Sequence, residues 1–129
     1  MSTIRLAVIG TGHLGRIHAR LAKSLADAQL TAVVDCQPQA RESVAQEVQV
    51  PAWEDLHQCL DQFDAAIVAT PTRFHHDVVL ELLQQGKHVL VEKPITLNAA
   101  DADNLVRTAD QTKRILQVGH VERFNPAFE

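Results

Sequence analysis

A glycine-rich hexapeptide near the N-terminus constrains the fold more than any other feature of this sequence. Residues 10–15 read Gly-Thr-Gly-His-Leu-Gly and hold three of the five glycines in the 129-residue chain. The apolar run 4–9 precedes them directly. Apolar residues then recur at helical spacing, at Leu14, Ile17, Leu21 and Leu25. A G-x-G-x-x-G loop between a strand and a helix is typical of a dinucleotide-binding site, and this context counts for more than the glycines alone.

Each glycine of this loop has a separate physical role in such a site. Gly10 permits a tight turn, Gly12 lets a pyrophosphate approach the backbone, and Gly15 lets the helix pack closely on the strand. Backbone amides at the start of the helix would face the phosphates. We therefore predict that the whole loop contacts the cofactor, through Gly10, Thr11, Gly12, His13, Leu14 and Gly15.

An acidic residue follows at the expected distance. Asp35 lies twenty residues beyond Gly15, at the end of the apolar run 30–34. A carboxylate there accepts hydrogen bonds from the adenine-ribose hydroxyls and repels a 2′-phosphate, which favours NAD over NADP. Arg41 is near enough in sequence to interact with a 2′-phosphate, so NADP also stays possible. The alternative is that Asp35 only caps a helix that begins near Gln37.

The remainder of the chain alternates between short apolar runs and helical patterns. We expect strands at 4–9, 30–34, 50–53, 65–69, 88–91 and 115–118. We expect helices at 14–25, 41–48, 55–60, 74–85 and from Asn98, as N-cap, through Ala109. The strands are apolar on both faces, as in a parallel sheet covered on each side. The predicted fold is therefore α/β: a doubly wound, mostly parallel six-stranded sheet with helices on both faces.

Composition excludes several classes of protein. With 46% hydrophobic and 22% charged residues, the chain is predicted to be one ordinary globular domain. Its net charge of −4 argues against nucleic acid as the main partner. No apolar run approaches the roughly 20 residues that span a bilayer. Cys36 and Cys59 form neither a disulfide framework nor a metal-ligand pattern. We expect a cytoplasmic protein without membrane or nucleic-acid partners.

Polar residues also gather after the fourth and fifth predicted strands. In an open parallel sheet, ligands lie beyond the carboxyl ends of the strands, at the point where the strand order reverses. The run 65–69 is followed by Thr70-Pro71-Thr72 and then His75, and the run 88–91 by Glu92-Lys93-Pro94. These residues fall where a nicotinamide would lie. Adjacent His75 and His76 have no third ligand at suitable spacing, so we predict no metal site.

Three motifs together make the sequence similar to a known family. G-T-G-H-L-G, A-T-P-T-x-x-H and G-K-H-V-L-V-E-K-P resemble the N-terminal half of the glucose-fructose oxidoreductase/inositol dehydrogenase/rhizopine-catabolism (Gfo/Idh/MocA) family, over essentially all 129 residues. The tail 118–128, V-G-H-V-E-R-F-N-P-A-F, most resembles members that oxidise the 3-hydroxyl of UDP-N-acetylglucosamine-type sugars. The resemblance implies an NAD(P)-dependent dehydrogenase that acts on a CH–OH group.

The resemblance also implies roles for particular residues. Lys93 would be catalytic, beside the nicotinamide and in contact with the reacting hydroxyl of the substrate. Glu92 would contact the nicotinamide ribose or orient Lys93, and the peptide bond before Pro94 would be cis. The cofactor channel would be lined by Thr70, Pro71, Thr72 and His75. The alternative for Glu92 and Lys93 is a solvated ion pair at a strand end.

The last residues are expected to lead out of the cofactor-binding domain. The resemblance implies an NAD(P)-binding domain at 1–119 and, at 120–129, the start of a linker into a C-terminal α/β substrate domain outside this sequence. Arg123 and Asn125 would then bind substrate, or else belong to a plain linker. We expect the chain to bind NAD(H) without turnover, and the full-length protein to bind a sugar or nucleotide sugar and to form a homo-oligomer.

Two other functions fit the same sequence. One is a dehydrogenase of the same family that acts on a different sugar or polyol, because the residues that choose the substrate lie mostly outside this chain. The other is a non-catalytic module that senses NAD or binds a partner protein. Lys93 argues against the second, since a sensor has no need of a cation at the hydride site.

Overall fold

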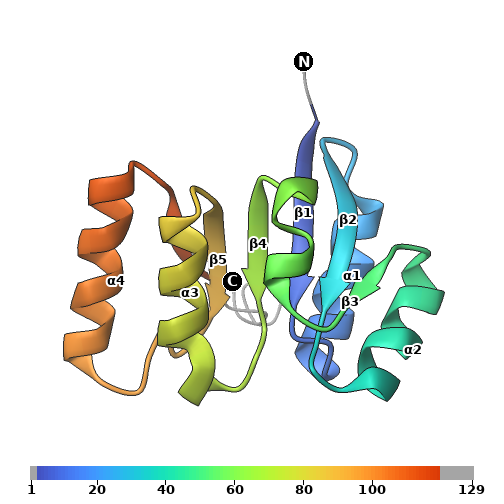
Figure 1. Ribbon diagram of the computed structural model, residues 1–129, viewed down its shortest axis with the longest axis horizontal. Helices are drawn as coiled ribbons and strands as arrows, with labels where there is room; N and C mark the ends of the chain where they lie inside the picture. The colour runs from blue at the N-terminus through green and yellow to red at the C-terminus, as the bar shows by residue number, and fades with distance from the viewer. Residues whose placement is uncertain (1–2, 120–129) are drawn as a thin grey trace, which may run out of the picture.

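The computed structural model describes residues 3–119 as one sheet with helices on both sides (Figure 1). The strands are β1 (Ile4–Ile9), β2 (Ala28–Val34), β3 (Ala52–Trp53), β4 (Ala65–Val68), β5 (His88–Glu92) and β6 (Leu116–Gly119). The α-helices are α1 (His13–Ser24), α2 (Pro38–Val48), α3 (His75–Gln84) and α4 (Ala99–Thr112). Short 3-10 turns are η1 (Leu56–Gln58), η2 (Leu60–Gln62) and η3 (Thr72–Phe74).

The sheet has the order β3-β2-β1-β4-β5-β6, and every neighbouring pair is parallel. The chain builds outward from β1 to β3, crosses back to β4 beside β1, and then builds outward in the other direction. The order therefore reverses between β1 and β4. The predicted doubly wound six-stranded sheet is confirmed, and it is parallel throughout. The third strand is shorter than predicted, because only Ala52 and Trp53 pair with β2.

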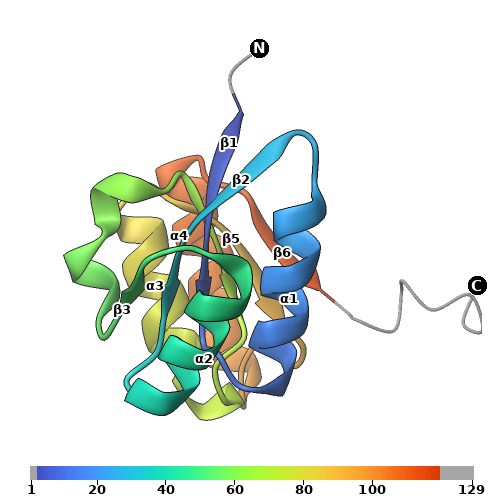
Figure 2. The same ribbon diagram turned by 90° about the vertical axis from the view of Figure 1, so that its right-hand side faces the viewer.

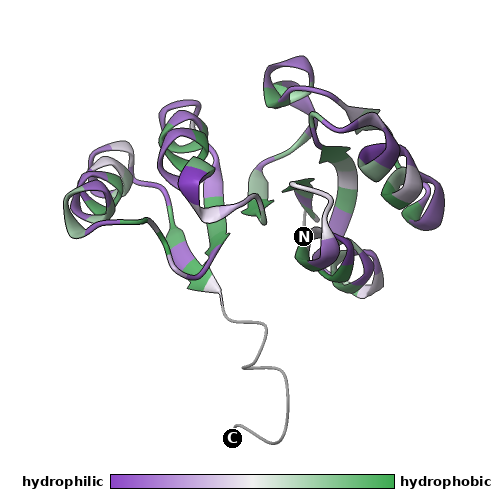
Figure 3. Ribbon diagram, turned by 90° about the horizontal axis from the view of Figure 1, so that it is seen from below, coloured by the Kyte–Doolittle hydropathy of each residue, from purple (hydrophilic) through white to green (hydrophobic). Residues whose placement is uncertain are grey.

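Two apolar clusters pack on opposite faces of the sheet. Helices α1 and α2 cover one face, where Ala19, Ala22 and Val44 pack on Val8 and Val33. Helices α3 and α4, with η1, cover the other, in a cluster that includes Phe63, Val79, Leu82, Leu83 and Leu105. Figure 2 shows α1 and α3 on opposite sides of the strands. In Figure 3 the helices carry both hydrophobic and hydrophilic residues, as two-sided packing requires.

Helix α1 buries a different face from the one that its large apolar residues suggest. Leu14, Leu21 and Leu25 are 39%, 45% and 54% exposed. The residues that it buries are Gly15, His18, Ala19 and Ala22. Small side chains let a helix lie close to the sheet, so the leucines that predicted this helix are not the residues that attach it.

The predicted N-cap of the last helix agrees with the structure. Asn98 is the N-cap of α4, and its Oδ1 accepts a hydrogen bond from the Asp101 amide at 2.8 Å. Gly86, just past α3, has a positive φ of 80°. Gly86 follows the end of the helix before β5, and Asn98 precedes the start of the helix after it. Together they help to fix the position of the loop that follows this strand.

Candidate cofactor-binding site

The predicted cofactor residues lie in loops along one edge of the sheet. The arrowheads of β2, β4 and β5 point to the lower edge in Figure 1, where α1 begins. The loops that follow β1, β2, β4 and β5 meet there, because parallel strands all end at the same edge. This edge includes the reversal of strand order between β1 and β4, which is where open α/β sheets bind ligands.

Two glycines fix the path of the first loop. Gly10 has φ +101°, and a Cβ there would lie 2.7 Å from the carbonyl carbon of Ala69. At Gly15 a Cβ would lie 1.8 Å from the Gly10 carbonyl oxygen. The first glycine lets the turn pass against the end of β4, and the second lets α1 press against the loop. Both packing roles agree with the prediction.

Gly12 differs from these two glycines because a side chain added there would meet open space among the described residues. Its φ of −72° is accessible to any residue, and a Cβ there would meet no atom within 4 Å. Gly12 is also the N-cap of α1, and within residues 3–119 no side chain caps the amides of that first turn. The neighbouring His13 and Leu14 are exposed. Open space beside uncapped helix amides suits an anion such as a pyrophosphate.

Asp35 joins the glycine loop to the end of β2. Its Oδ2 accepts hydrogen bonds from the amide and the hydroxyl of Thr11, at 2.8 and 2.9 Å, and its Oδ1 accepts one from the Gln37 amide at 2.9 Å. Partial burial favours the neutral acid, but the hydrogen bonds from Gln37 and Thr11 outweigh it and hold the pKa of Asp35 below its usual range. The carboxylate is therefore ionised at neutral pH.

The structure bears on both interpretations of Asp35. Its bond to Gln37 lies just before α2, because Gln37 is itself the N-cap of that helix and no side chain caps it within the described residues. The contact with Thr11 does not exclude ribose binding, because each carboxylate oxygen can accept a second hydrogen bond. Thr11 itself is 2% exposed. Its predicted contact with the cofactor stays a prediction, whereas its bond to Asp35 was not predicted. Arg41 lies near the end of β2, and its guanidinium donates to the Asp35 backbone carbonyl oxygen at 3.2 Å.

The loop after β4 offers a free hydroxyl. The Thr70 Oγ1 is buried and has no hydrogen-bond partner within residues 3–119. Pro71 is exposed and Thr72 half-buried, at the start of η3. The ring of His75 is 1% exposed, with Nε2 at 2.8 Å from the Thr70 carbonyl oxygen and Nδ1 at 2.9 Å from that of Pro94. His75 thus joins the loops after β4 and β5.

The Glu92-Lys93-Pro94 segment lies at the end of β5, whose last residue is Glu92. The Lys93–Pro94 peptide bond is cis, as the resemblance implied, and Lys93 is exposed. Glu92 is 6% exposed and bonds to His18 of α1. Glu92 is buried and bonded to a residue of α1 rather than exposed to water beside Lys93. The alternative of a solvated Glu92–Lys93 ion pair is therefore wrong.

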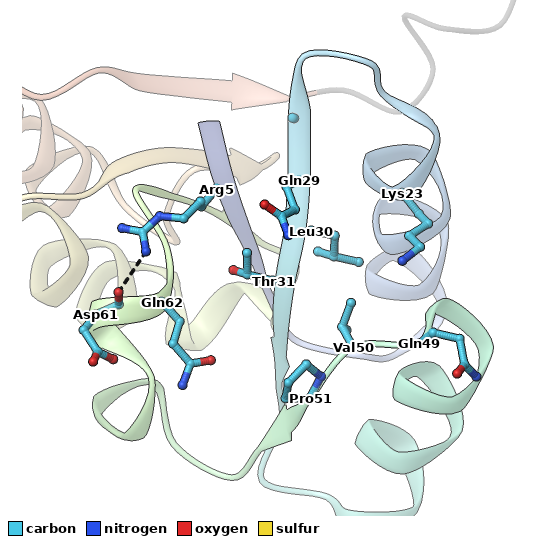
Figure 4. Close-up of a pocket in the computed structure, with 11 residues that line it drawn as sticks. Arg5, Lys23, Gln29, Leu30, Thr31, Gln49, Val50, Pro51, Asp61 and Gln62 are labelled. Carbon is cyan, nitrogen blue, oxygen red and sulfur yellow. Dashed lines mark hydrogen bonds between the residues drawn. The ribbon is translucent and has the colours of Figure 1, made fainter. Parts of the chain in front are cut away.

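One hollow in the molecule lies far from these loops. It measures about 570 Å³ and lies at the opposite edge, near the starts of β1 and β2 (Figure 4). Among the residues that line it are Arg5, Gln29 and Gln62, and Arg5 also donates to the Asp61 carbonyl oxygen at 3.1 Å. None of the predicted cofactor residues lines this hollow, so it is separate from the candidate cofactor site.

Arg123, Asn125 and the predicted linker 120–129 lie outside the described residues. Within residues 3–119 no group of three or more histidine, cysteine, aspartate or glutamate side chains is arranged to hold a metal ion. In the same part of the chain no helix is both long enough and apolar enough to cross a membrane.

Comparison with known proteins identifies the family. The profile of the GFO_IDH_MocA oxidoreductase family, described as an NAD-binding Rossmann fold, matches residues 4–120. The chain belongs to the Gfo/Idh/MocA family. The predicted fold and the predicted NAD-binding domain are therefore confirmed.

Individual relatives within the Gfo/Idh/MocA family differ in substrate. The chain is 38% identical to UDP-N-acetylglucosamine 3-dehydrogenase of Acidithiobacillus ferrooxidans, over 100% of the chain and 41% of the relative. It is 37% identical to scyllo-inositol 2-dehydrogenase (NAD(+)) of Bacillus subtilis, over 97% of the chain and 38% of the relative. It therefore spans about two fifths of the length of either enzyme.

Solved structures agree with this membership. The Acidithiobacillus ferrooxidans enzyme superposes with a TM-score of 0.90 at 37% identity, over 98% of this chain and 41% of that one. Scyllo-inositol dehydrogenase of Lactobacillus casei, solved with bound NAD(H) and scyllo-inositol, gives 0.88 at 28% identity, over 98% and 39%.

Proposed function

We propose that this chain is the cofactor-binding part of an NAD-dependent dehydrogenase that acts on a sugar hydroxyl. One observation carries the proposal: Lys93, followed by a cis proline, comes directly after β5 at the same sheet edge as the glycine loop and Asp35. A dinucleotide laid along that edge from Asp35 past Gly12 would bring its nicotinamide to the β4–β5 side, beside Lys93.

The residues at this edge fit a nicotinamide dinucleotide. The first-turn amides of α1, the open space at Gly12 and the unpartnered Thr70 hydroxyl would hold the pyrophosphate and the ribose nearby. Asp35, ionised and already ordered by Thr11, would accept the adenine-ribose hydroxyls and disfavour a 2′-phosphate. The bound cofactor would be NAD rather than NADP, although Arg41 offers a 2′-phosphate one cation.

The chemistry of the reaction divides between cofactor and protein. When bound, NAD would accept a hydride from the carbon that bears the substrate hydroxyl, and the proton of that hydroxyl would pass to a base in the substrate domain. The ammonium of Lys93 stabilises the negative charge that develops on that hydroxyl oxygen as the hydride leaves. Glu92 holds the backbone immediately before Lys93, and Thr72 and His75 shape the loop on its other side. Lys93 is the catalytic residue that this chain supplies.

The substrate class is part of the proposal. We favour the 3-hydroxyl of a UDP-N-acetylhexosamine, because the tail 118–128 resembles members with that activity and a relative so named is 38% identical. Arg123 and Asn125 would contact this substrate. An inositol is the second candidate, supported by a relative that is 37% identical. The substrate domain beyond residue 129 and the homo-oligomeric state of the full-length protein belong to the same proposal.

The cofactor part can be tested through the single tryptophan of the chain. The Trp53 carbonyl oxygen accepts a hydrogen bond from the Asp35 amide at 3.0 Å, so this residue is a direct neighbour of the one that would bind the ribose. Reduced nicotinamide absorbs where tryptophan emits, and binding should quench Trp53. We expect NADH to bind at least about tenfold more tightly than NADPH, the effect of one charged hydrogen bond or more.

Asp35→Asn provides the decisive variant. This change should weaken NADH binding and reduce the ratio of NADH affinity to NADPH affinity. The reason is that the asparagine amide cannot accept the same hydrogen bonds and does not repel a phosphate. Asp77→Asn is the matched control, since that side chain is 91% exposed on α3. Equal loss of both cofactors would contradict the ribose role, and failure of the wild-type chain to bind either one would contradict the function itself.

The substrate part has a separate test. NADH formation should be measured with UDP-N-acetylglucosamine and with scyllo- and myo-inositol, using this chain and the full-length protein that contains it. We expect turnover by the full-length protein only, and with the nucleotide sugar. Saturable oxidation by the 129-residue chain alone would refute the need for a second domain. Turnover of an inositol alone would select the second candidate.

A further inference from the structure

Lys93 lies between two backbone segments that buried histidines hold in place. His18 of α1 bonds to Glu92, immediately before the lysine, and His75 of α3 contacts the carbonyl oxygen of Pro94, immediately after it. We propose that His18 is a positioning residue: through Glu92, it sets where the ammonium of Lys93 lies relative to the nicotinamide. This inference rests on the proposed function of Lys93.

The position of His18 is itself fixed by the glycine loop. It follows Gly15 by three residues and shares its buried face of α1. Gly15 lies so close to the Gly10 carbonyl oxygen that α1 has little freedom to move toward or away from the sheet. The imidazole therefore projects toward β5 from a well-defined starting point, and it is only 5% exposed as a residue.

Glu92 lies at the last position of β5, on the face of the sheet that α1 covers. The side chains of Glu92 and His18 are both 7% exposed, so the pair is shielded from water. A carboxylate in such surroundings needs a hydrogen-bond donor, and the Nε2–H of His18 supplies one to Glu92 Oε1. Losing that donor would leave Glu92 to turn toward water, and the peptide bond to Lys93 would turn with it.

The other side of Lys93 is held independently. His75 Nδ1 lies 2.9 Å from the Pro94 carbonyl oxygen and 3.2 Å from that of Ile95. The amide of Lys93 donates to the Gly119 carbonyl oxygen of β6 at 3.3 Å. Loss of His18 should therefore release only the Glu92 side, and the turn would tilt rather than unfold.

A buried polar pair of this kind is a weak source of stability. Its desolvation cost offsets much of its attraction, and apolar residues of the same size often serve the fold as well. A buried pair one residue before a catalytic lysine instead fixes the direction in which that lysine side chain points. This account predicts a defect confined to the nicotinamide end of the site, whereas a purely structural role predicts a general loss of binding and stability.

Two ligands separate the ends of the site. ADP reaches only the glycine loop and Asp35, whereas NADH extends to Lys93. The variants are His18→Gln, whose amide nitrogen can replace Nε2, and His18→Asn, whose amide is too short to reach Glu92. Both are polar and both remove the ring, so their effects on folding are matched. His57→Gln is the control, because that histidine is 56% exposed and belongs to η1.

We expect ADP affinity within about twofold of wild type in all three variants. We expect the ratio of NADH to ADP affinity to fall about tenfold in His18→Asn, as for one lost hydrogen bond to a charged group, and to recover in His18→Gln. In the double variant His18→Asn/Lys93→Ala, the affinity ratio should fall no further than in Lys93→Ala alone, because His18 acts through the lysine.

Three results would overturn the inference. An unchanged ratio in His18→Asn would show that the pair does not position Lys93. Equal weakening of ADP and NADH, with a lower melting temperature, would make His18 a structural residue only. Additive losses of affinity in the double variant would show that His18 acts independently of Lys93. If the wild-type chain bound ADP but gained nothing from the nicotinamide half, the proposed role of Lys93 would fail first.

Should both His18 variants unfold, Glu92→Gln would test the same pair. The ratio of NADH to ADP affinity is expected to fall in that variant as well.

Discussion

Two neighbouring glycines should respond in opposite ways to the same substitution. Gly12→Ala adds a methyl group where no atom lies within 4 Å, at a φ of −72° that alanine adopts freely. Gly15→Ala adds one 1.8 Å from the Gly10 carbonyl oxygen, a backbone atom that cannot rotate away. We expect the first change to remove cofactor binding and keep the fold, and the second to damage the fold itself.

The magnitudes follow from these distances. An ordinary contact needs about 3.4 Å, so α1 and the loop would have to separate by roughly 1.6 Å at Gly15. Overpacking of this kind costs about 3 kcal/mol or more, since neither side can yield. At roughly 4 °C per kcal/mol for a chain of this size, Gly15→Ala should lower the melting temperature by about 12 °C or more. At Gly12 the loss of a good N-cap residue costs about 1 kcal/mol at most.

The binding effect of Gly12→Ala should be much larger than its effect on stability. A methyl group in the open space would hold a pyrophosphate away from the first-turn amides of α1, and each hydrogen bond lost to a charged oxygen weakens binding about tenfold or more. Circular dichroism melting and quenching of Trp53 by NADH measure the two quantities in one sample. Full NADH affinity in Gly12→Ala would refute the pyrophosphate site, and equal melting temperatures for the two variants would refute the packing argument.

Two further predictions concern stability alone. His57 joins η1 to α3 through Asp55 and Glu81, at 2.7 and 2.6 Å, and its bonds to Glu81 and then Asp55 raise its pKa. The cluster should therefore stabilise the fold below the ordinary histidine pKa, and this stabilisation should be lost as pH rises through the raised pKa of His57. Urea unfolding of wild type and His57→Gln at about pH 5.5 and pH 8.5 checks this. An equal difference in unfolding free energy between the two proteins at both pH values would contradict it. Lys113 ends α4 with φ 56°, so Lys113→Gly should raise the melting temperature by about 2–4 °C, and a decrease would show that its side chain stabilises that helix end.

The sequence predicted those features that depend on local chemistry. The glycine loop and the Asn98 cap each follow from what one residue type can do at one position. The parallel sheet followed from short strands that are apolar on both faces. The family motifs located Lys93 and the cis peptide before Pro94, which no periodicity would have revealed.

The features that were missed depend on contacts between distant residues. Thr11 and Asp35 are 24 positions apart and His18 and Glu92 are 74 apart, so no local pattern joins either pair. The signal that could have found them is chemical: a histidine on the small-residue face of α1 and a glutamate at the end of a buried strand both need partners. Apolar periodicity predicted the extent of α1 but not its buried face. The reason is that the pattern was read from large apolar side chains, whereas the face packed on the sheet carries small ones.

These missed contacts give α1 a role at both ends of the site. The loop before it holds Asp35 through Thr11, and its second turn holds Glu92 through His18. Gly15 sets the depth of the helix for both. Displacing α1 should therefore disturb the two ends together, so Gly15→Ala should weaken ADP and NADH alike, whereas His18→Asn should spare ADP. Selective loss of NADH in Gly15→Ala would mean that the adenine end does not depend on this helix, and the common anchor would have to lie in the strands instead.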